Sequence, residues 1–331
     1  MKGSPSRGSK GPAPPARDAV PPPSAEGAQE RGEAAQRRRG EIVDSQVHVW
    51  AVDTPQRPWI PGTASMAGRP HYGIDELTRD MAEAGVDAAV LVPPGAWEGY
   101  WNDLVLDAAV RWPTRFAAMV NIDPVAPDTA RTLGALLSSP GARGLRLGLS
   151  QGARREAFAR GELGWLWGLL EERRTPTAIF VPGLLDAAEA VARAHPKLPL
   201  ALCHLSMNLR HLNPDVDAVI DRLVRLADCP NVSVKVSAVP LQSAMPYPFE
   251  DMHAPLERVL RAFGAERLFW GSDHTRLADH AENGANYAQS RRLFTEALPF
   301  LSGRERDAVM GGSLCRWLDW PQAGAATRSE A

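Results

Sequence analysis

Short apolar runs alternate with amphipathic stretches along the chain from residue 41 onward. Eight of these runs predict strands, at residues 41–50, 86–94, 115–124, 142–150, 175–183, 198–206, 231–240 and 267–276. The stretches between them repeat apolar residues with the helical period. In one of them, residues 73–85, Asp75 can cap the start of a helix and Gly85 can end it. Eight strands that alternate with helices predict an α/β fold, specifically a (β/α)8 TIM barrel.

A doubly wound open sheet is the alternative to the barrel, because it is built from the same alternation. No glycine-rich phosphate loop follows any of the eight runs, which weakens the nucleotide-binding form of that alternative. We expect the barrel at residues 41–320. Residues 1–40 are rich in Pro, Gly, Ser, Ala and Arg and have few large apolar side chains, so they predict a disordered extension, and residues 321–331 predict a disordered tail.

Composition limits the class of partner. The 331 residues are 44% hydrophobic with a formal net charge of -2, which is typical of a globular protein without a strong overall field. We therefore expect a small-molecule substrate rather than nucleic acid or a membrane, and the oligomeric state stays open. Three cysteines without paired spacing and the lack of a recognisable secretory signal predict a cytoplasmic protein.

Polar side chains interrupt the apolar runs near their ends. They are Gln46 and His48 in the first run, Asn121 and Asp123 in the third, Arg146 in the fourth, His204 in the sixth, Lys235 and Ser237 in the seventh, and Asp273 in the eighth. Taken singly, His204 could be a core histidine, Lys235 a structural partner of Asp273, and Arg146 a helix cap. Together they indicate a site, because the carboxyl ends of all barrel strands meet at one mouth.

Four motifs resemble those of a known family. They occur in the same order as in that family, and their spacing is that of strands in a barrel. The first run contains D-S-Q-V-H at 44–48, His204 closes the sixth, the seventh contains K-V-S at 235–237, and the eighth contains G-S-D at 271–273. The set resembles the amidohydrolase superfamily of metal-dependent hydrolases. It is most similar to the amidohydrolase-2 group, which includes lactonases and decarboxylases. The resemblance covers about residues 41–320 and implies a hydrolase with the TIM-barrel fold.

The first run departs from the family pattern at Gln46. The family offers two histidines to a divalent metal in this run, and its metal-dependent members supply another from the fifth strand, where this sequence has none. Glutamine is a poor ligand for zinc. The resemblance is therefore closest to the lactonase-like branch that works without a metal, and no cofactor is expected. Zinc or manganese, if bound, would be held by His48, His204 and Asp273.

The resemblance implies that Asp273, His204 and His48 are the catalytic residues. Without a metal, Asp273 is expected to act as general base on water, while His48 and His204 polarise the carbonyl or protonate the leaving oxygen. Arg146 and Lys235 would hold a negative group of the substrate or the developing charge. The other residues expected to bind the substrate are Gln46, Trp50, Arg57, Tyr72, Asn208, His274 and Arg276, with Arg210 and His211 at the same rim.

Three interpretations of function stay open. The first is a metal-independent hydrolase of a small, anionic lactone or related cyclic ester, because an alkoxide leaves more readily than an amine when no metal assists. The second is a metal-dependent amidohydrolase or decarboxylase in which Gln46 is tolerated. The third is a non-catalytic barrel that binds a small molecule; the presence of His48, His204, Lys235 and Asp273 counts against it.

Overall fold

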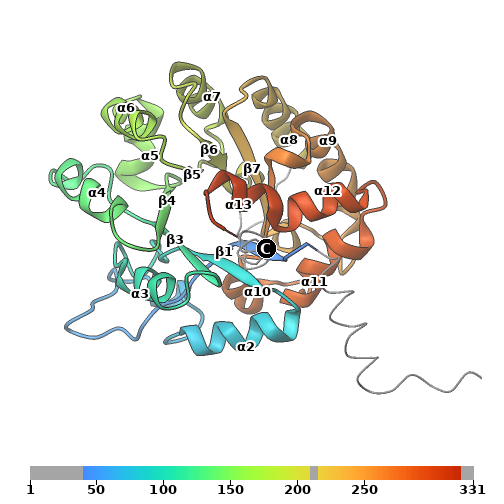
Figure 1. The fold of residues 1–331 in the computed structure, drawn as a ribbon, viewed down its shortest axis with the longest axis horizontal. Coiled ribbons are helices and arrows are strands. Elements are labelled where there is room, and N and C mark those ends of the chain that lie inside the picture. The colour runs from blue at the N-terminus through green and yellow to red at the C-terminus, as the bar shows by residue number, and fades with distance from the viewer. Residues whose placement is uncertain (1–39, 209–214, 322–331) are drawn as a thin grey trace, which may run out of the picture. The chain divides into compact units, whose positions relative to one another are not determined.

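The computed structural model describes residues 40–208 and 215–321, and Figure 1 shows them as a ring of strands surrounded by helices. Eight parallel strands form one sheet in the order of the chain. They are β1 (Val43–Val47), β2 (Ala88–Leu91), β3 (Phe116–Val120), β4 (Ala142–Gly148), β5 (Thr177–Phe180), β6 (Leu200–Leu202), β7 (Val232–Ser237) and β8 (Leu268–Gly271). Each lies within its predicted run, so the TIM-barrel prediction is confirmed.

Most helices form the outer layer of the barrel, and the last one crosses one end of the ring (Figure 1). The helices are α2 (Ile74–Ala84), α3 (Asp103–Arg111), α4 (Thr129–Leu137), α5 (Gly152–Ala159), α6 (Gly164–Glu172), α7 (Leu185–Ala194), α8 (Val216–Arg225), α9 (His253–Phe263), α10 (His274–His280), α11 (Tyr287–Arg292), α12 (Gly303–Asp307) and α13 (Ser313–Trp317). None of the helices in the described ranges is long and apolar enough to cross a membrane. Arg210 and His211 lie outside the described residues, as do residues 1–39 and 322–331.

Helix α2 begins and ends where the sequence suggested, but its first cap differs from the prediction. Gly73 is the N-terminal cap, and its backbone N–H donates to the Glu76 carboxylate at 2.5 Å. Asp75 instead lies in the first turn of the helix, where its charge is favourable to the helix dipole. Gly85 ends the helix with a φ of 70°, as predicted, since glycine adopts left-handed backbone without a steric penalty.

The strands alternate their side chains between an outer and an inner apolar cluster. In β3, Phe116, Ala118 and Val120 belong to the cluster that includes the helices, whereas Ala117 and Met119 belong to a second cluster inside the ring. Leu314, Leu318 and Trp320, which lie in and after α13, complete this inner cluster. Trp320 Nε1 donates to the carbonyl of Pro113, just before β3. The α13 segment therefore packs against the amino ends of the strands and leaves the carboxyl ends for the site.

Candidate active site

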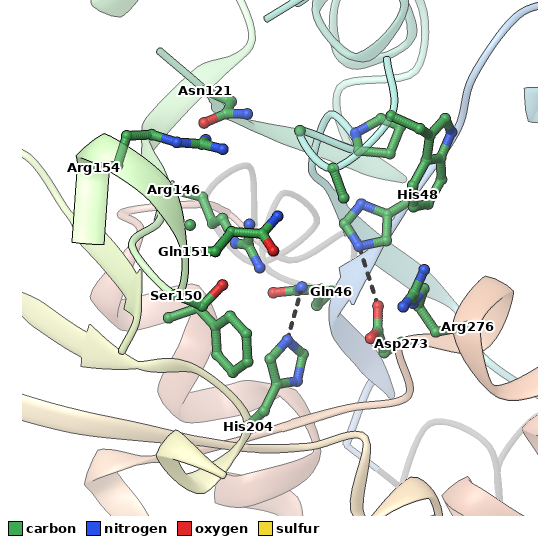
Figure 2. A pocket seen from close by; sticks show the side chains of 16 residues that line it. Gln46, His48, Asn121, Arg146, Ser150, Gln151, Arg154, His204, Asp273 and Arg276 are labelled. Carbon is green, nitrogen blue, oxygen red and sulfur yellow. Dashed lines mark hydrogen bonds and ion pairs between the residues drawn. The ribbon is translucent and has the colours of Figure 1, made fainter. Parts of the chain in front are cut away.

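A cavity of about 100 Å³ lies at the carboxyl ends of the strands, and Figure 2 shows the side chains that surround it. Its polar and charged groups come from β1, β4, the turn after β6, and the segments that follow β3, β4 and β8. The loop after β2 adds an apolar wall. The lining residues are Gln46, His48, Pro94, Gly95, Ala96, Trp97, Asn121, Arg146, Gly148, Ser150, Gln151, Arg154, Phe180, His204, Asp273 and Arg276.

The G-S-D segment closes the ring between β8 and β1. A Cβ atom on Gly271 would lie 2.5 Å from Ser45 Oγ, so only glycine permits this approach of the two strands. The Ser272 backbone N–H donates to Asp44 Oδ1 at 3.0 Å, and its hydroxyl donates to Asp44 Oδ2. The Asp273 backbone N–H then donates to the Gln46 carbonyl at 3.1 Å. This junction fixes Asp273 next to the first strand.

Asp44 is the buried centre of that junction. Besides Ser272, it accepts hydrogen bonds from the Gln46 backbone N–H at 2.9 Å and from the Tyr287 hydroxyl at 2.8 Å. Burial raises its pKa, and these hydrogen bonds oppose the rise. The register of β1 shifts between Asp44 and Val47. With this shift Asp44 faces β8 and α11, while Gln46 and His48 face the cavity.

His48 and Asp273 form one corner of the cavity. His48 Nδ1 lies 2.7 Å from the Val92 carbonyl oxygen, which can only accept, so this nitrogen donates. The other ring nitrogen, Nε2, lies 3.1 Å from Asp273 Oδ1. Burial alone would raise the pKa of Asp273, but the contact with His48 and nearby positive charges, Arg276 among them, hold this pKa below its ordinary value. Asp273 is therefore ionised at neutral pH.

His204 lies in a second corner with a different environment. Its Nε2 lies 3.1 Å from Gln46 Nε2, and its Nδ1 lies 2.9 Å from Ser237 Oγ. Burial lowers the pKa of His204 to about 3; Asp273 opposes this shift, while Arg146 and Lys235 add to it. The imidazole of His204 is therefore neutral at pH 7, and it packs edge-on against Phe180.

Both corners rest on backbone that is strained for residues with a side chain. His204 has a φ of 56° and Asp273 a φ of 54°, in the left-handed region that costs roughly 1–2 kcal/mol per non-glycine residue. Surrounding bonds hold both turns in place: Gln242 Nε2 donates to the His204 carbonyl at 2.8 Å, and Asp273 N–H donates to Gln46. Such strain is found where a site requires a particular side-chain direction.

Three arginines supply most of the charge on the cavity wall. Arg146 lies on β4 with its guanidinium over the Phe180 ring, Arg154 lies in the first turn of α5, and Arg276 contacts Trp97 and the Met66 carbonyl. The buried Nε of Arg146 has no hydrogen-bond partner within the described ranges. Asp273 is the one acidic residue among the lining side chains. The wall therefore favours an anionic ligand.

The donor atoms in the cavity do not suit a metal ion. Within residues 40–208 and 215–321, no three His, Cys, Asp or Glu side chains gather closely enough to hold one. At the position of the missing first-strand histidine, Gln46 directs its amide nitrogen at His204 Nε2 and its oxygen at Lys235. Zinc is usually held by three or four His, Cys or carboxylate donors, which this corner does not provide.

The structure brings together half of the residues expected from the sequence. Those that line the cavity are Gln46, His48, Arg146, His204, Asp273 and Arg276. Trp97, from the loop after β2, also lines it. The other expected residues, which are Trp50, Arg57, Tyr72, Asn208, Lys235 and His274, are not among the lining side chains. Lys235 lies directly behind the lining, where its Nζ contacts Gln46 Oε1 at 2.5 Å.

The remaining five have other surroundings. Trp50 packs behind Trp97 with ring centroids 5.2 Å apart. Tyr72 and His274 both contact Asp80 Oδ2, at 2.6 and 2.8 Å. Asn208 is exposed. Arg57 binds Glu98 and makes a bidentate ion pair with Asp103, which ties the loop after β1 to the start of α3.

Sequence reasoning missed the segment after β4. Ser150, Gln151 and Arg154 line the cavity at the start of α5, and Figure 2 shows Arg154 on the side opposite Asp273. The signal was present in S-Q-G-A-R-R at 150–155, because this polar run directly follows a strand whose carboxyl end lies at the mouth. Asn121, noted only as a late polar residue of the third run, also belongs to the wall.

Comparisons with known proteins give a consistent result. The model of a family described as amidohydrolase matches residues 43–313. L-fucono-1,5-lactonase of Burkholderia ambifaria is 29% identical over 287 residues, which are 83% of this chain and 94% of the lactonase. Among solved structures, an amidohydrolase from Burkholderia multivorans with bound zinc matches with a TM-score of 0.69 at 24% identity, covering 85% of this chain and 100% of that one.

A second solved structure, described as a 2-pyrone-4,6-dicarboxylic acid hydrolase from Pseudomonas putida, matches with a TM-score of 0.60 at 21% identity. The match covers 85% of this chain and 98% of that chain. At these identities the two solved structures establish a shared fold.

Proposed function

Since the chain belongs to the amidohydrolase family, we propose that it hydrolyses a small anionic lactone or related cyclic ester, with Asp273 as the general base on water. The observation that carries this proposal is the pairing of Asp273 with His48 in a cavity whose other charged wall residues include three arginines. A buried carboxylate that stays ionised can accept a proton, and arginines suit the carboxylate of a substrate.

The proposed reaction uses these residues as follows. Asp273 takes a proton from water as the water oxygen bonds to the ester carbonyl carbon. The ring C–O bond then breaks, and the ring oxygen takes the proton that Asp273 accepted. His48 holds the Asp273 carboxylate in place through Nε2, and its own ring is fixed by the bond from Nδ1 to the Val92 carbonyl. The product is an open-chain hydroxy acid.

The charged wall opposite Asp273 is proposed to bind the acidic group of the substrate. Arg146 has a buried Nε without a partner in the described part of the chain, and a buried unsatisfied donor is unfavourable until a ligand pairs with it. Arg154 lies beside it at the amino end of α5, where the helix dipole also favours an anion. Asn121 is adjacent (Figure 2).

We propose that this reaction proceeds without a metal ion. The support is the donor set: Gln46 offers an N–H where a metal ligand would stand, and its oxygen is engaged by Lys235. No step above therefore passes through a metal. The lactonase of Burkholderia ambifaria, at 29% identity, supports a lactone as the substrate class.

His204 has a narrower role in this proposal than the sequence suggested. A neutral imidazole whose Nε2 faces an amide N–H has no proton to give to a leaving oxygen on that side. We propose that it orients Gln46 rather than protonating the substrate. Lys235 likewise contacts Gln46 rather than the cavity, because its Nζ donates to Gln46 Oε1 from behind the lining.

A panel of lactones tests the proposal. Each lactone, with and without a carboxylate substituent, is added to purified protein, and ring opening is followed by the proton that the product acid releases. The proposal expects turnover of at least one carboxylate-bearing lactone and a lower kcat/KM for its uncharged analogue. Preference for the uncharged analogue contradicts the role of the arginines. Thermal stabilisation by a lactone without any turnover supports the non-catalytic binding barrel instead.

A further inference from the structure

A chain of hydrogen bonds runs beneath the cavity and connects β7, β1 and the turn after β6. Lys235 Nζ donates to Gln46 Oε1 at 2.5 Å, Gln46 Nε2 lies 3.1 Å from His204 Nε2, and His204 Nδ1 lies 2.9 Å from Ser237 Oγ. All four side chains belong to residues that are at most 1% exposed. Bulk water therefore does not compete for these bonds.

The chemistry of lysine sets the direction of the whole chain. The Lys235 Nζ donates, so the Gln46 atom that faces it is the carbonyl oxygen, and the amide NH2 must face His204. An NH2 group needs an acceptor, so His204 Nε2 has no proton and Nδ1 donates to Ser237 Oγ. If the Gln46 amide were reversed, its oxygen would face His204, and the proton would have to be on Nε2.

The same amide has a second N–H. His204 accepts only one of the two hydrogens on Gln46 Nε2, while Gln46 itself lines the cavity. Figure 2 shows this amide in the middle of the site, between His204 and His48. The second hydrogen is therefore left for a group that enters the cavity.

We propose that Lys235 and His204 are positioning residues that hold the Gln46 amide so that its second N–H donates to the carbonyl oxygen of a bound substrate. When water attacks the carbonyl carbon, the π electron pair moves onto this oxygen, and the Gln46 N–H stabilises the negative charge without transferring its proton. The pair returns to form the carbonyl as the ring C–O bond breaks. That the acceptor is the carbonyl oxygen of a lactone rests on the proposed function, but the orientation of the Gln46 amide does not.

The variant Gln46→Glu tests the orientation, because it keeps the shape of the side chain and the acceptor for Lys235 but removes both N–H groups. A carboxylate facing His204 requires a donor there, so the ring proton should move to Nε2. Long-range ¹H–¹⁵N spectra of the histidine rings report the tautomer, and the His204 signals are assigned by their loss in His204→Gln. We expect Nδ1–H in the wild type and Nε2–H in Gln46→Glu.

The kinetics of the same variants test the role of the second N–H. Removal of one oxyanion donor lowers kcat by about 10²–10³-fold, so Gln46→Glu should lose kcat to this extent while KM changes little. Lys235→Met removes the donor to Gln46 but leaves the N–H groups, and should lower kcat less and give a mixture of His204 tautomers. Gln289→Glu makes the same chemical change at a half-buried glutamine in the first turn of α11, which is not among the residues that line the cavity, and should alter neither readout.

The outcomes separate this inference from the proposed function. Nε2–H in the wild type overturns the orientation, with or without a known substrate. The expected tautomers with an unchanged kcat in Gln46→Glu overturn the role of the second N–H. If no lactone is opened by the wild type, the proposed function fails, while the tautomer still decides how the amide is held.

Discussion

The two histidines of the cavity have opposite surroundings. His48 faces a carboxylate on one side and a backbone carbonyl on the other, so both of its ring nitrogens face acceptors. His204 faces an amide nitrogen on one side and a serine hydroxyl on the other, and is fully buried. The residue type is the same, but the neighbours differ: His48 faces the ionised carboxylate of Asp273, whereas His204 faces an amide nitrogen and stays neutral. We assign proton transfer to the His48 corner and orientation of the substrate carbonyl to the His204 corner.

The largest expected effect comes from breaking the His48 corner with Asp273→Asn. Asparagine keeps an oxygen that can accept from His48 and tolerates the left-handed backbone at this position. It cannot accept a proton from water, so kcat should fall by about 10³-fold, within the range for a lost general base. Rates on the preferred lactone and circular dichroism, measured together, separate lost chemistry from lost folding.

A matched variant controls for the change of charge. Asp251→Asn alters a carboxylate that bonds Ser243 and Ala244 away from the cavity, and should retain wild-type kcat. Retention of full activity by Asp273→Asn would show that the His48 corner does not supply the base.

The next largest effect is expected from Arg146, the cationic side chain near the His204 corner. Arg146→Gln should raise KM for a carboxylate-bearing lactone by roughly 10-fold or more, since a charged hydrogen bond contributes about 1.5–3 kcal/mol, and should leave KM for an uncharged lactone nearly unchanged. Arg57→Gln is the control, because the Arg57 guanidinium is engaged by Glu98 and Asp103 outside the cavity. Equal losses for charged and uncharged lactones would contradict the proposed role of Arg146.

The neutral state of His204 predicts how stability depends on pH. Below about pH 6.5 the unfolded chain protonates this histidine, whereas the folded protein resists protonation down to about pH 3. The unfolded state then binds more protons, so the free energy of unfolding falls as the pH falls, by up to about 1.4 kcal/mol per pH unit.

His204→Gln removes that contribution. Its free energy of unfolding, measured in urea between pH 6 and pH 4.5, should fall less steeply with acid than that of the wild type. His71→Gln, at an exposed histidine outside the cavity, is the matched control. Parallel slopes for His204→Gln and the wild type would mean that His204 carries a proton in the folded protein.

The smallest effect is expected on the wall shared by both corners. A Cβ on Gly95 would lie 2.3 Å from Asn121 Nδ2, so Gly95→Ala must displace that amide from the cavity wall. We expect a loss of a few-fold in kcat/KM. Gly168→Ala, on α6 with open space around the new methyl, should leave kinetics unchanged and stabilise the helix by up to about 1 kcal/mol. Identical kinetics for the two variants would exclude Asn121 from substrate binding.

The positions of all eight strands could be predicted, because a parallel barrel needs one apolar run for each strand. The side-chain directions at strand ends could not. The prediction extended the first strand to residue 50 and expected Trp50 to bind the substrate, but β1 ends at Val47 after a register shift and Trp50 turns behind Trp97. Local alternation does not determine where a strand stops pairing.

The contacts between segments far apart in the chain also could not be predicted from the sequence. From the sequence, Arg57 is expected to bind the substrate. In the fold, its guanidinium is paired with Glu98 and Asp103 instead. Lys235 is a second case. The sequence predicts that it holds a negative group of the substrate or the developing charge, but the barrel places its Nζ on Gln46 Oε1, behind the cavity lining. That position depends on how β7 and β1 are staggered around the ring.

The central claim is that the protein hydrolyses a lactone without a metal ion. The most direct test measures the rate of lactone hydrolysis before and after exhaustive chelation, together with the metal content of the same sample. We expect no stoichiometric metal and an unchanged rate, because in the proposed mechanism Asp273, held by His48, activates water without a metal ion. A rate that chelation abolishes and zinc or manganese restores would contradict the account, and would require the mechanism to be rebuilt around a bound metal ion.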